Sequence, residues 1–240
     1  MHFLSQVFHW FGDGSHWRGP SGIPVLFWHQ AELSLAVVAG AILLGGGAGV
    51  LLGHSGRGGL VAVNAANAAR AVPTLALLTL LAIQPSISLK WDGFLASFIA
   101  LVVLAIPPVL TNTYVGMREV DAEVRDAAKA MGLRGGQVLR EVELPLALPF
   151  MLAGIRTASI EVIATSTLAA YVSYTDLGTY VIAGLNSQDN VEAFSGALLV
   201  VLLAALVAVG LSLVRRGLTP APLRRRRDGG RLSGVAPAQA

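Results

Sequence analysis

The sequence contains no cysteine and little charge. Only 13% of its 240 residues are charged, whereas 54% are hydrophobic, and the mean hydropathy is +0.66. Without cysteine the chain has no disulfide, no thiolate nucleophile and no cysteine-based metal site. A soluble domain of this length carries about 25% charged residues. The low charge therefore indicates a membrane protein rather than a soluble domain with a large core.

Signals for catalysis and nucleotide binding are also missing. No GxxxxGK[ST] phosphate loop occurs, because the glycine-rich pieces LLGGGAG and HSGRGG have no lysine after them. All five histidines lie within the first 54 residues, without HExxH spacing and with few carboxylates nearby. We therefore expect no catalysis, no metal and no cofactor in this chain. The N-terminus also lacks the basic start and small-residue cleavage site of a signal peptide, so we expect the first span to be retained.

Apolar runs of about 20 residues, enough for a helix to cross a bilayer, occur five times. The predicted spans are residues 33–53, 60–84, 93–117, 145–172 and 193–214. The predicted fold is thus an all-α membrane protein with about five transmembrane helices, in a domain covering residues 29–214. Residues 1–28 precede this domain, and their aromatic and aliphatic side chains recur at helical spacing from Phe3 to Phe11. We expect this segment to lie in the membrane interface.

The distribution of lysine and arginine predicts the orientation. Of the residues outside the spans, 13 Lys and Arg lie in segments 54–59, 118–143 and 215–240, against Arg18 and Lys90 on the other side. The basic side is expected to be cytoplasmic, with the N-terminus and the loops 85–92 and 173–192 outside. The tail, residues 215–240, is rich in Pro, Gly and Arg, and we expect it to be disordered and to contact anionic lipid rather than nucleic acid.

A charged segment, residues 118–144, interrupts the apolar chain on the predicted cytoplasmic side. Apolar residues recur every three or four positions, which is typical of one helix face: Val120, Val124, Ala127, Ala128 and Met131. Gly132 stands where a helix ends in a left-handed residue, and a second short helix is expected before Pro145. Such a stripe is buried either on the membrane interface or the chain's own spans, or in the groove of a soluble partner.

The sequence DAAKAMG, which is separated by nine residues from VELP, resembles the EAA signature of ABC-importer permeases of type I. Similar pieces, among them RAVPTLALLTL, AIPPVLTNTYVGM and LPFMLAGIRTA, resemble permeases for osmoprotectants such as glycine betaine, choline, carnitine and proline. The resemblance covers about residues 29–212. It implies a coupling helix that docks on an ATPase subunit through Glu123, Asp126, Ala127, Ala128, Met131, Gly132, Val142, Leu144 and Pro145. It departs from the family at Arg134-Gly135-Gly136, where many relatives carry Ser or Thr at the first position.

The resemblance also implies partners. These are an ATPase subunit that binds ATP and Mg²⁺, a second permease copy or a paralogue, and an extracytoplasmic solute-binding protein, all at the bacterial cytoplasmic membrane. Import of methionine or another small solute is an alternative within the class. A secondary transporter or channel that needs no ATPase is a rival from another class, but it predicts an inverted repeat, which the sequence does not display.

Polar residues inside the predicted spans mark a candidate pathway or interface, because ionisable groups in a membrane face a cavity or one another. They are Asn64, Asn67, Arg70, Arg156 and Glu161. Arg156 and Glu161 are five residues apart, about 140° around a helix, so they are poor partners for each other. We therefore expect Glu161 to pair with a basic residue on another helix, with Arg70 as the candidate. Extension of Arg156 toward the cytoplasmic surface is an alternative that explains part of the pattern equally well.

The outer loop 173–192 is long enough for a short helix. Its carboxylates, Asp176, Asp189 and Glu192, are candidates for docking a binding protein, although a solvated acidic loop would explain them equally well. Because aromatic rings bind trimethylammonium groups, Tyr171, Tyr174 and Tyr180 are candidates for contact with a solute.

Overall fold

The computed structural model describes residues 2–84 and 93–218, and within them every regular element is a helix. Four continuous helical stretches are long and apolar enough to cross a membrane, and they run over Ile23–Ser55, Phe94–Arg118, Gly135–Val172 and Asn190–Leu218. A bent pair of shorter helices supplies a fifth span if it is counted as one. The predicted all-α membrane fold is confirmed. The predicted loop 85–92 and the tail beyond residue 218 lie outside the described residues.

The first membrane helix begins ten residues before the predicted span. It consists of α2 (Ile23–Ala41), a π-helical turn η2 (Ile42–Gly46) and α3 (Gly47–Ser55). Pro24 lies in the first turn of α2, where its fixed φ and missing N–H are tolerated. The polar residues His29, Gln30 and Glu32 interrupt the apolar run here, which is why hydropathy alone placed the start too late.

The second predicted span is broken. Helices α4 (Gly59–Ala69) and α5 (Thr74–Ala82) meet at an angle of 76°, with Arg70 to Pro73 between them. Proline disfavours the helical conformation in the residue before it, and this accounts for the position of the break. Arg70 is therefore placed at a bend and not in the middle of a straight helix.

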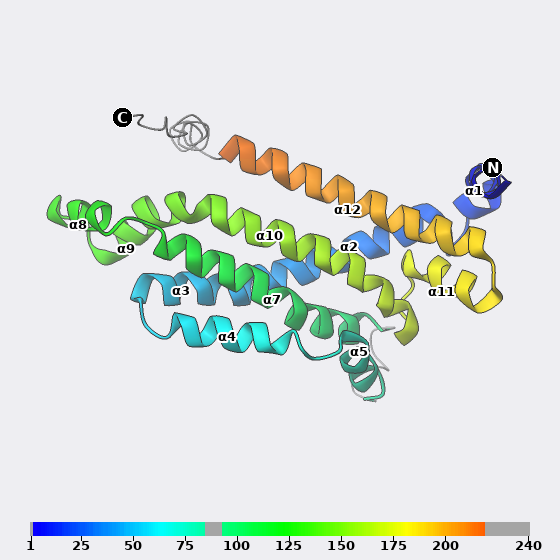
Figure 1. The fold of residues 1–240 in the computed structure, drawn as a ribbon, viewed down its shortest axis with the longest axis horizontal. Helices are drawn as coiled ribbons and strands as arrows, with labels where there is room; N and C mark the ends of the chain where they lie inside the picture. The colour runs from blue at the N-terminus through cyan, green and yellow to red at the C-terminus, as the bar shows by residue number, and fades with distance from the viewer. Residues whose placement is uncertain (1, 85–92, 219–240) are drawn as a thin grey trace, which may run out of the picture.

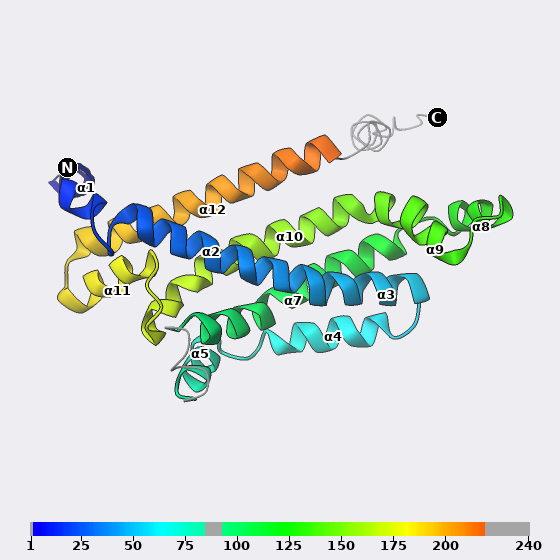
Figure 2. The ribbon, with the colours of Figure 1, turned by 180° about the vertical axis from the view of Figure 1, so that it is seen from behind.

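The helix α7 (Phe94–Arg118) lies at the centre of the bundle and packs against α2, α3, α4, α5 and α10. Figures 1 and 2 show it between α10 on one side and α3 and α4 on the other. Along α3, the glycines at every fourth position face α7: a Cβ added to Gly49 would lie 2.8 Å from Cβ of Thr113, and one added to Gly53 would lie 2.4 Å from Cβ of Met117. Small residues let the two helices approach closely.

The remaining elements extend the bundle at its two ends. At one end lie α8 (Ala122–Ala130), α9 (Gly135–Gln137) and a π-helical turn η3 (Val138–Glu143), which continues directly into α10 (Leu144–Ser166). At the other end, α10 tightens into the 3₁₀ helix η4 (Thr167–Val172) and is followed by α11 (Gly178–Ser187). We call these the α8 end and the α11 end (Figure 1).

The N-terminal segment lies at the α11 end. Helix α1 (His2–Gly12) packs across α12 (Asn190–Leu218), and a short 3₁₀ helix η1 (Gly14–Trp17) follows it. The predicted N-terminal helix is therefore present. Val7 and Trp10 are buried, while Leu4 and Phe8 stay exposed, so one face contacts the bundle and the other is free. The C-terminal part of α12 leaves the bundle, as Figure 2 shows.

Candidate functional site

Helix α8 is built by local signals at both of its ends. Asp121 caps the first turn, and its Oδ1 accepts from the backbone N–H of Glu123 at 3.0 Å. At the other end Gly132 has φ +90°, its N–H donates to Lys129 O, and the N–H of Leu133 donates to Ala128 O. This pair of bonds is the Schellman motif, which requires a left-handed residue. The helix end predicted at Gly132 is confirmed.

The segment that departs from the resemblance, Arg134-Gly135-Gly136, still begins a helix. The side chain of Arg134 does not cap the next turn. Instead, Oε1 of Gln137 accepts from the backbone N–H of Arg134 at 2.9 Å. The hydrogen bond of a Ser or Thr cap to a following N–H is thus absent, and the side chain of Gln137 bonds back to the N–H of residue 134 in its place. The second helix then runs without interruption into the membrane helix, and the π-helical turn before Pro145 marks where the regular hydrogen-bond pattern changes.

The apolar stripe predicted on α8 divides between two faces. Ala128 is 3% exposed and packs against its own chain, so its predicted role as a direct ATPase contact is wrong. Val124 and Met131 are 44% and 76% exposed, and Ala127 is exposed beside them. These three residues, spaced i, i+3 and i+7, form an uncovered apolar face, which we call the free face of α8. Helix α8 itself lies at one end of the molecule, beyond the membrane helices (Figure 1).

The other residues predicted for coupling surround this face or lie at the start of α10. Glu123 and Asp126 are exposed, and Asp126 Oδ1 lies 3.3 Å from Nζ of Lys129 in an ion pair on the surface. Val142 and Leu144 are half-buried, and Pro145 is exposed. The segment thus presents two apolar residues, an alanine and two carboxylates to one side of the molecule.

A buried carboxylate that the sequence analysis overlooked connects α8 to the bundle. Glu143 is 2% exposed; its Oε2 accepts from Nδ1 of His54 at 2.6 Å, and its Oε1 lies 2.8 Å from Nε of Arg125. Nη2 of Arg125 also donates to the backbone oxygen of Met117. The only sequence signal was a glutamate between apolar residues at a helix entrance, and its partners lie 89 and 18 positions away.

The intramembrane pair predicted from the sequence is present. Nη2 of Arg70 lies 2.6 Å from Oε2 of Glu161, and this bond joins the bend after α4 to the C-terminal part of α10. Asn64 and Asn67 are exposed on α4, and Arg70 follows directly after this helix. Arg156 does not pair with Glu161; its Nε lies 3.3 Å from the backbone oxygen of Ala208 on α12. Of the predicted polar residues, Arg70 and Glu161 are therefore brought together, and Arg156 lies apart from them.

At the α11 end the predicted acidic surface is only partly present. Asp176 is fully buried, so its predicted role in docking is wrong. Its Oδ1 accepts from the N–H of Gly178 at 2.8 Å, at the start of α11. Asp189 is exposed and caps α12 by accepting from the N–H groups of Val191 and Glu192, and Glu192 is half-buried. Only Asp189 and Glu192 still belong to the outward surface.

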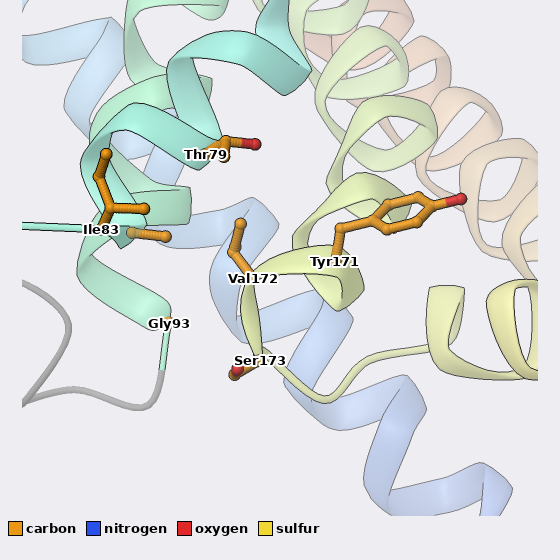
Figure 3. A pocket seen from close by; sticks show the side chains of 7 residues that line it. Thr79, Ile83, Gly93, Tyr171, Val172 and Ser173 are labelled. Carbon is orange, nitrogen blue, oxygen red and sulfur yellow. The ribbon is translucent and has the colours of Figure 1, made fainter.

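Two of the three candidate tyrosines have other roles. The hydroxyl of Tyr174 donates to His29 O at 3.0 Å and that of Tyr180 to Ser21 O at 2.6 Å, and both rings are buried. Only Tyr171, 56% exposed, has a free ring. It borders a cavity of about 400 Å³ between α5 and η4, but its ring extends away from Ile83 and Gly93 (Figure 3).

The part of the chain that the structure describes holds no cluster of side chains suited to a metal ion. No group of three or more His, Asp or Glu side chains within residues 2–84 and 93–218 is placed to bind a metal. The cavity at the α11 end is lined by seven residues, none of them charged. The distinctive polar and exposed features are therefore the free face of α8, the Glu143 cluster and the Arg70–Glu161 pair.

Comparison with known proteins gives one consistent result. The family model described as "binding-protein-dependent transport system inner membrane component" matches residues 41–223. The carnitine transport permease protein OpuCB of Listeria monocytogenes is 32% identical, with 85% of this chain and 91% of that protein covered. The choline transport system permease protein OpuBB of Bacillus subtilis (strain 168) is 33% identical, with 84% and 90% covered.

Among solved structures, a chain of the MetNI methionine ABC transporter in inward facing conformations has the same fold. The TM-score is 0.71 at 22% identity, and the alignment covers 80% of this chain and 94% of the other. At this identity the likeness concerns the fold alone.

The burial of Asp176 predicts a pH-dependent stability. Burial raises the pKa of this carboxyl from 3.8 to about 7, so the unfolded chain releases the proton at a lower pH than the folded chain does. Its contribution to stability is complete below about pH 4 and is lost as the pH rises to about 7. Replacing Asp176 by Asn keeps an acceptor for Gly178 and removes this loss, which amounts to roughly 2–3 kcal/mol between pH 5 and pH 7.

Thermal unfolding of the purified protein in detergent at pH 5, 6, 7 and 8 measures this difference. The unfolding temperature of the wild type is expected to fall with rising pH more steeply than that of the Asp176→Asn variant. Parallel curves for the two proteins would show that Asp176 keeps an ordinary pKa in the fold.

Proposed function

Because the chain belongs to the family of binding-protein-dependent transport system inner membrane components, we propose that it is the permease subunit of an ATP-driven importer for a compatible solute. It forms the transmembrane pathway together with a second copy or a paralogue. A separate ATPase subunit binds ATP and Mg²⁺ and docks on α8, and a solute-binding protein delivers the solute on the opposite side. The α8 end is then cytoplasmic, and the N-terminus and α11 lie outside.

The observation that carries this proposal is the free face of α8. Val124, Ala127 and Met131 are exposed on a helix that protrudes from the bundle, and an amphipathic helix is stable with its apolar face in a groove. The basic residues in the flanking segments support a cytoplasmic location of this helix, because cytoplasmic segments carry an excess of Lys and Arg. A secondary transporter or a channel has no ATPase subunit that would cover this apolar face.

The proposed solutes are quaternary amines and related compatible solutes. Support comes from the relatives, whose names specify carnitine and choline and which align over more than four fifths of this chain. The solved structure of a methionine transporter supports only the fold at its 22% identity. Import of methionine therefore remains the less supported alternative.

The docking role of α8 is tested by placing a charge on its free face. A Met131→Glu variant is expected to fold and insert, because Met131 is 76% exposed. The amount of ATPase that co-purifies with it should fall by at least about tenfold, since a charge within an apolar contact is costly. The measurement is the amount of the co-encoded ATPase retained on the tagged permease from membranes that express both. A Leu185→Glu variant is the matched control, because Leu185 is 60% exposed on α11 at the far end. Equal retention of the ATPase by Met131→Glu and wild type would refute docking at α8.

The solute is tested through the solute-binding protein that we expect to be encoded beside this permease. We expect the purified binding protein to bind at least one of glycine betaine, choline, carnitine and proline in isothermal titration calorimetry, with L-methionine as the comparison. Binding of methionine alone would assign the permease to the alternative solute class.

The pair of Arg70 and Glu161 is proposed to line the pathway or the contact between the two permease subunits. A Glu161→Gln variant leaves Arg70 unpaired, and we expect uptake into proteoliposomes to fall by roughly tenfold. A double variant, Arg70→Gln with Glu161→Gln, carries no unpaired charge and serves as the control for folding. Uptake that stays low in the folded double variant supports a role in transport, whereas normal assembly and uptake with Glu161→Gln alone would exclude it.

A further inference from the structure

We infer that Glu143 is a positioning residue that passes the movement of α8 to the transmembrane helices, with Arg125 and His54 as its two connections. This inference rests on the proposed function, because it presumes that an ATPase moves α8. It adds the physical link inside the permease itself, from the docking helix to the ends of three membrane helices.

The link is strong because Glu143 is buried and both of its oxygens are engaged. At 2% exposure, a carboxylate without partners would be costly, and removing one partner from a buried pair leaves an uncompensated charge. Nδ1 of His54 and Nε of Arg125 lie 2.6 and 2.8 Å from its two oxygens. Helix α8 therefore cannot separate from the bundle without removing Arg125 from Glu143, which leaves His54 as the remaining partner of the buried carboxylate.

The three connected segments are the ends of separate membrane helices. His54 is in the last turn of α3, Met117 in the last turn of α7, and Glu143 directly before α10. Arg125 on α8 reaches two of them, because its Nε lies 2.8 Å from Oε1 of Glu143 and its Nη2 donates to the backbone oxygen of Met117. The ends of α3 and α7 are themselves in close contact at Gly53 and Met117. A displacement of Arg125 thus acts on three helices at once.

Little else holds α8 to the rest of the chain. Of its nine residues only Ala128 is buried, and the segment that follows it, residues 129–137, is mostly exposed. The apolar contact of Ala128 alone would let α8 slide along the bundle, because dispersion attraction between a few atoms is weak and has no preferred direction. The ion pair of Arg125 with Glu143 sets the distance between α8 and the bundle, and the hydrogen bond from Arg125 to the backbone oxygen of Met117 adds direction. This polar joint, and not an apolar core, therefore determines where α8 lies.

The local helix geometry supports the same conclusion. Glu143 is the last residue of the π-helical turn η3. Such a turn contains one residue more than an α-helical turn and rotates the side chains on its two sides by about 100° relative to each other. The turn lets Val138 and Glu143 both face inward, although five positions in a regular α-helix differ by about 140°.

The joint is separate from the surface that binds the ATPase. Arg125 is 16% exposed as a side chain and Glu143 is 3% exposed, whereas Val124, Ala127 and Met131 form the free face on the other side of α8. Neutralising Glu143 should leave that face intact. If Glu143 were needed only for folding, its substitution would instead reduce ATPase retention and solute uptake together.

The test uses the complete transporter in proteoliposomes. The chain is co-purified with the ATPase encoded with it, and its binding protein is added together with ¹⁴C-labelled glycine betaine, choline, carnitine and proline. The variants are Glu143→Gln and the double variant Arg125→Gln with Glu143→Gln, which leaves no unpaired charge and is therefore expected to fold. Glu141→Gln is the matched control, because it is the same change two residues away at an exposed position.

Three quantities are measured for each protein: ATPase retained, ATP hydrolysed, and solute taken up per ATP. We expect Glu143→Gln and the double variant to retain the ATPase within about twofold and to hydrolyse ATP, while uptake per ATP falls by about tenfold, within the range of coupling effects of single residues. Glu141→Gln should behave like the wild type.

The outcomes separate this inference from the proposed function. A wild-type chain that retains no ATPase, or takes up none of the four solutes, contradicts the proposed function, and the inference falls with it. An active wild type whose uptake per ATP is unchanged in Glu143→Gln and in the double variant overturns the inference alone. Loss of the ATPase in parallel with uptake in both variants also overturns it, because Glu143 would then act only as a staple.

Discussion

The contact of Arg125 with the buried carboxylate of Glu143 is the interaction on which the α8 end depends. It holds a charged, mostly exposed helix against an apolar bundle, and it joins that helix to the ends of α3, α7 and α10. Without this contact, α8 would be held to the bundle mainly by Ala128, which is its one buried residue. The position of the free face relative to the membrane helices follows from this contact, and so does any movement that the face transmits.

The same constraint explains the other charges in the apolar part of the chain. An ionised group in a membrane needs a partner or contact with water, and Arg70 finds Glu161 while Arg156 reaches a backbone oxygen on α12. The bend between α4 and α5 places Arg70 where it meets α10. Close packing of α3 on α7 through glycine then holds the bundle together, with α7 at its centre.

The sequence predicted most of what depends on local or additive properties. Apolar runs indicated the spans, Gly132 indicated the end of α8, and the cost of a lone charge indicated the pairing of Arg70 with Glu161. It did not indicate that Glu143 meets His54 and Arg125, because that contact arises only when three distant segments are packed together. Asp176 was misplaced for a related reason: a loop carboxylate is usually solvated, whereas here tertiary packing buries it. Pro73 was a local signal for the bend after Arg70 that hydropathy obscured.

The central claim is that α8 is the surface through which an ATPase drives this permease. The most direct measurement incorporates the photo-crosslinking amino acid p-benzoyl-phenylalanine at Ala127, in the middle of the free face, and separately at Leu185 at the α11 end. Irradiation of membranes that contain the co-encoded ATPase should crosslink the ATPase to the chain from position 127 and not from position 185. A crosslink from position 185 alone, or none from position 127 in a complex that still hydrolyses ATP, would contradict the account.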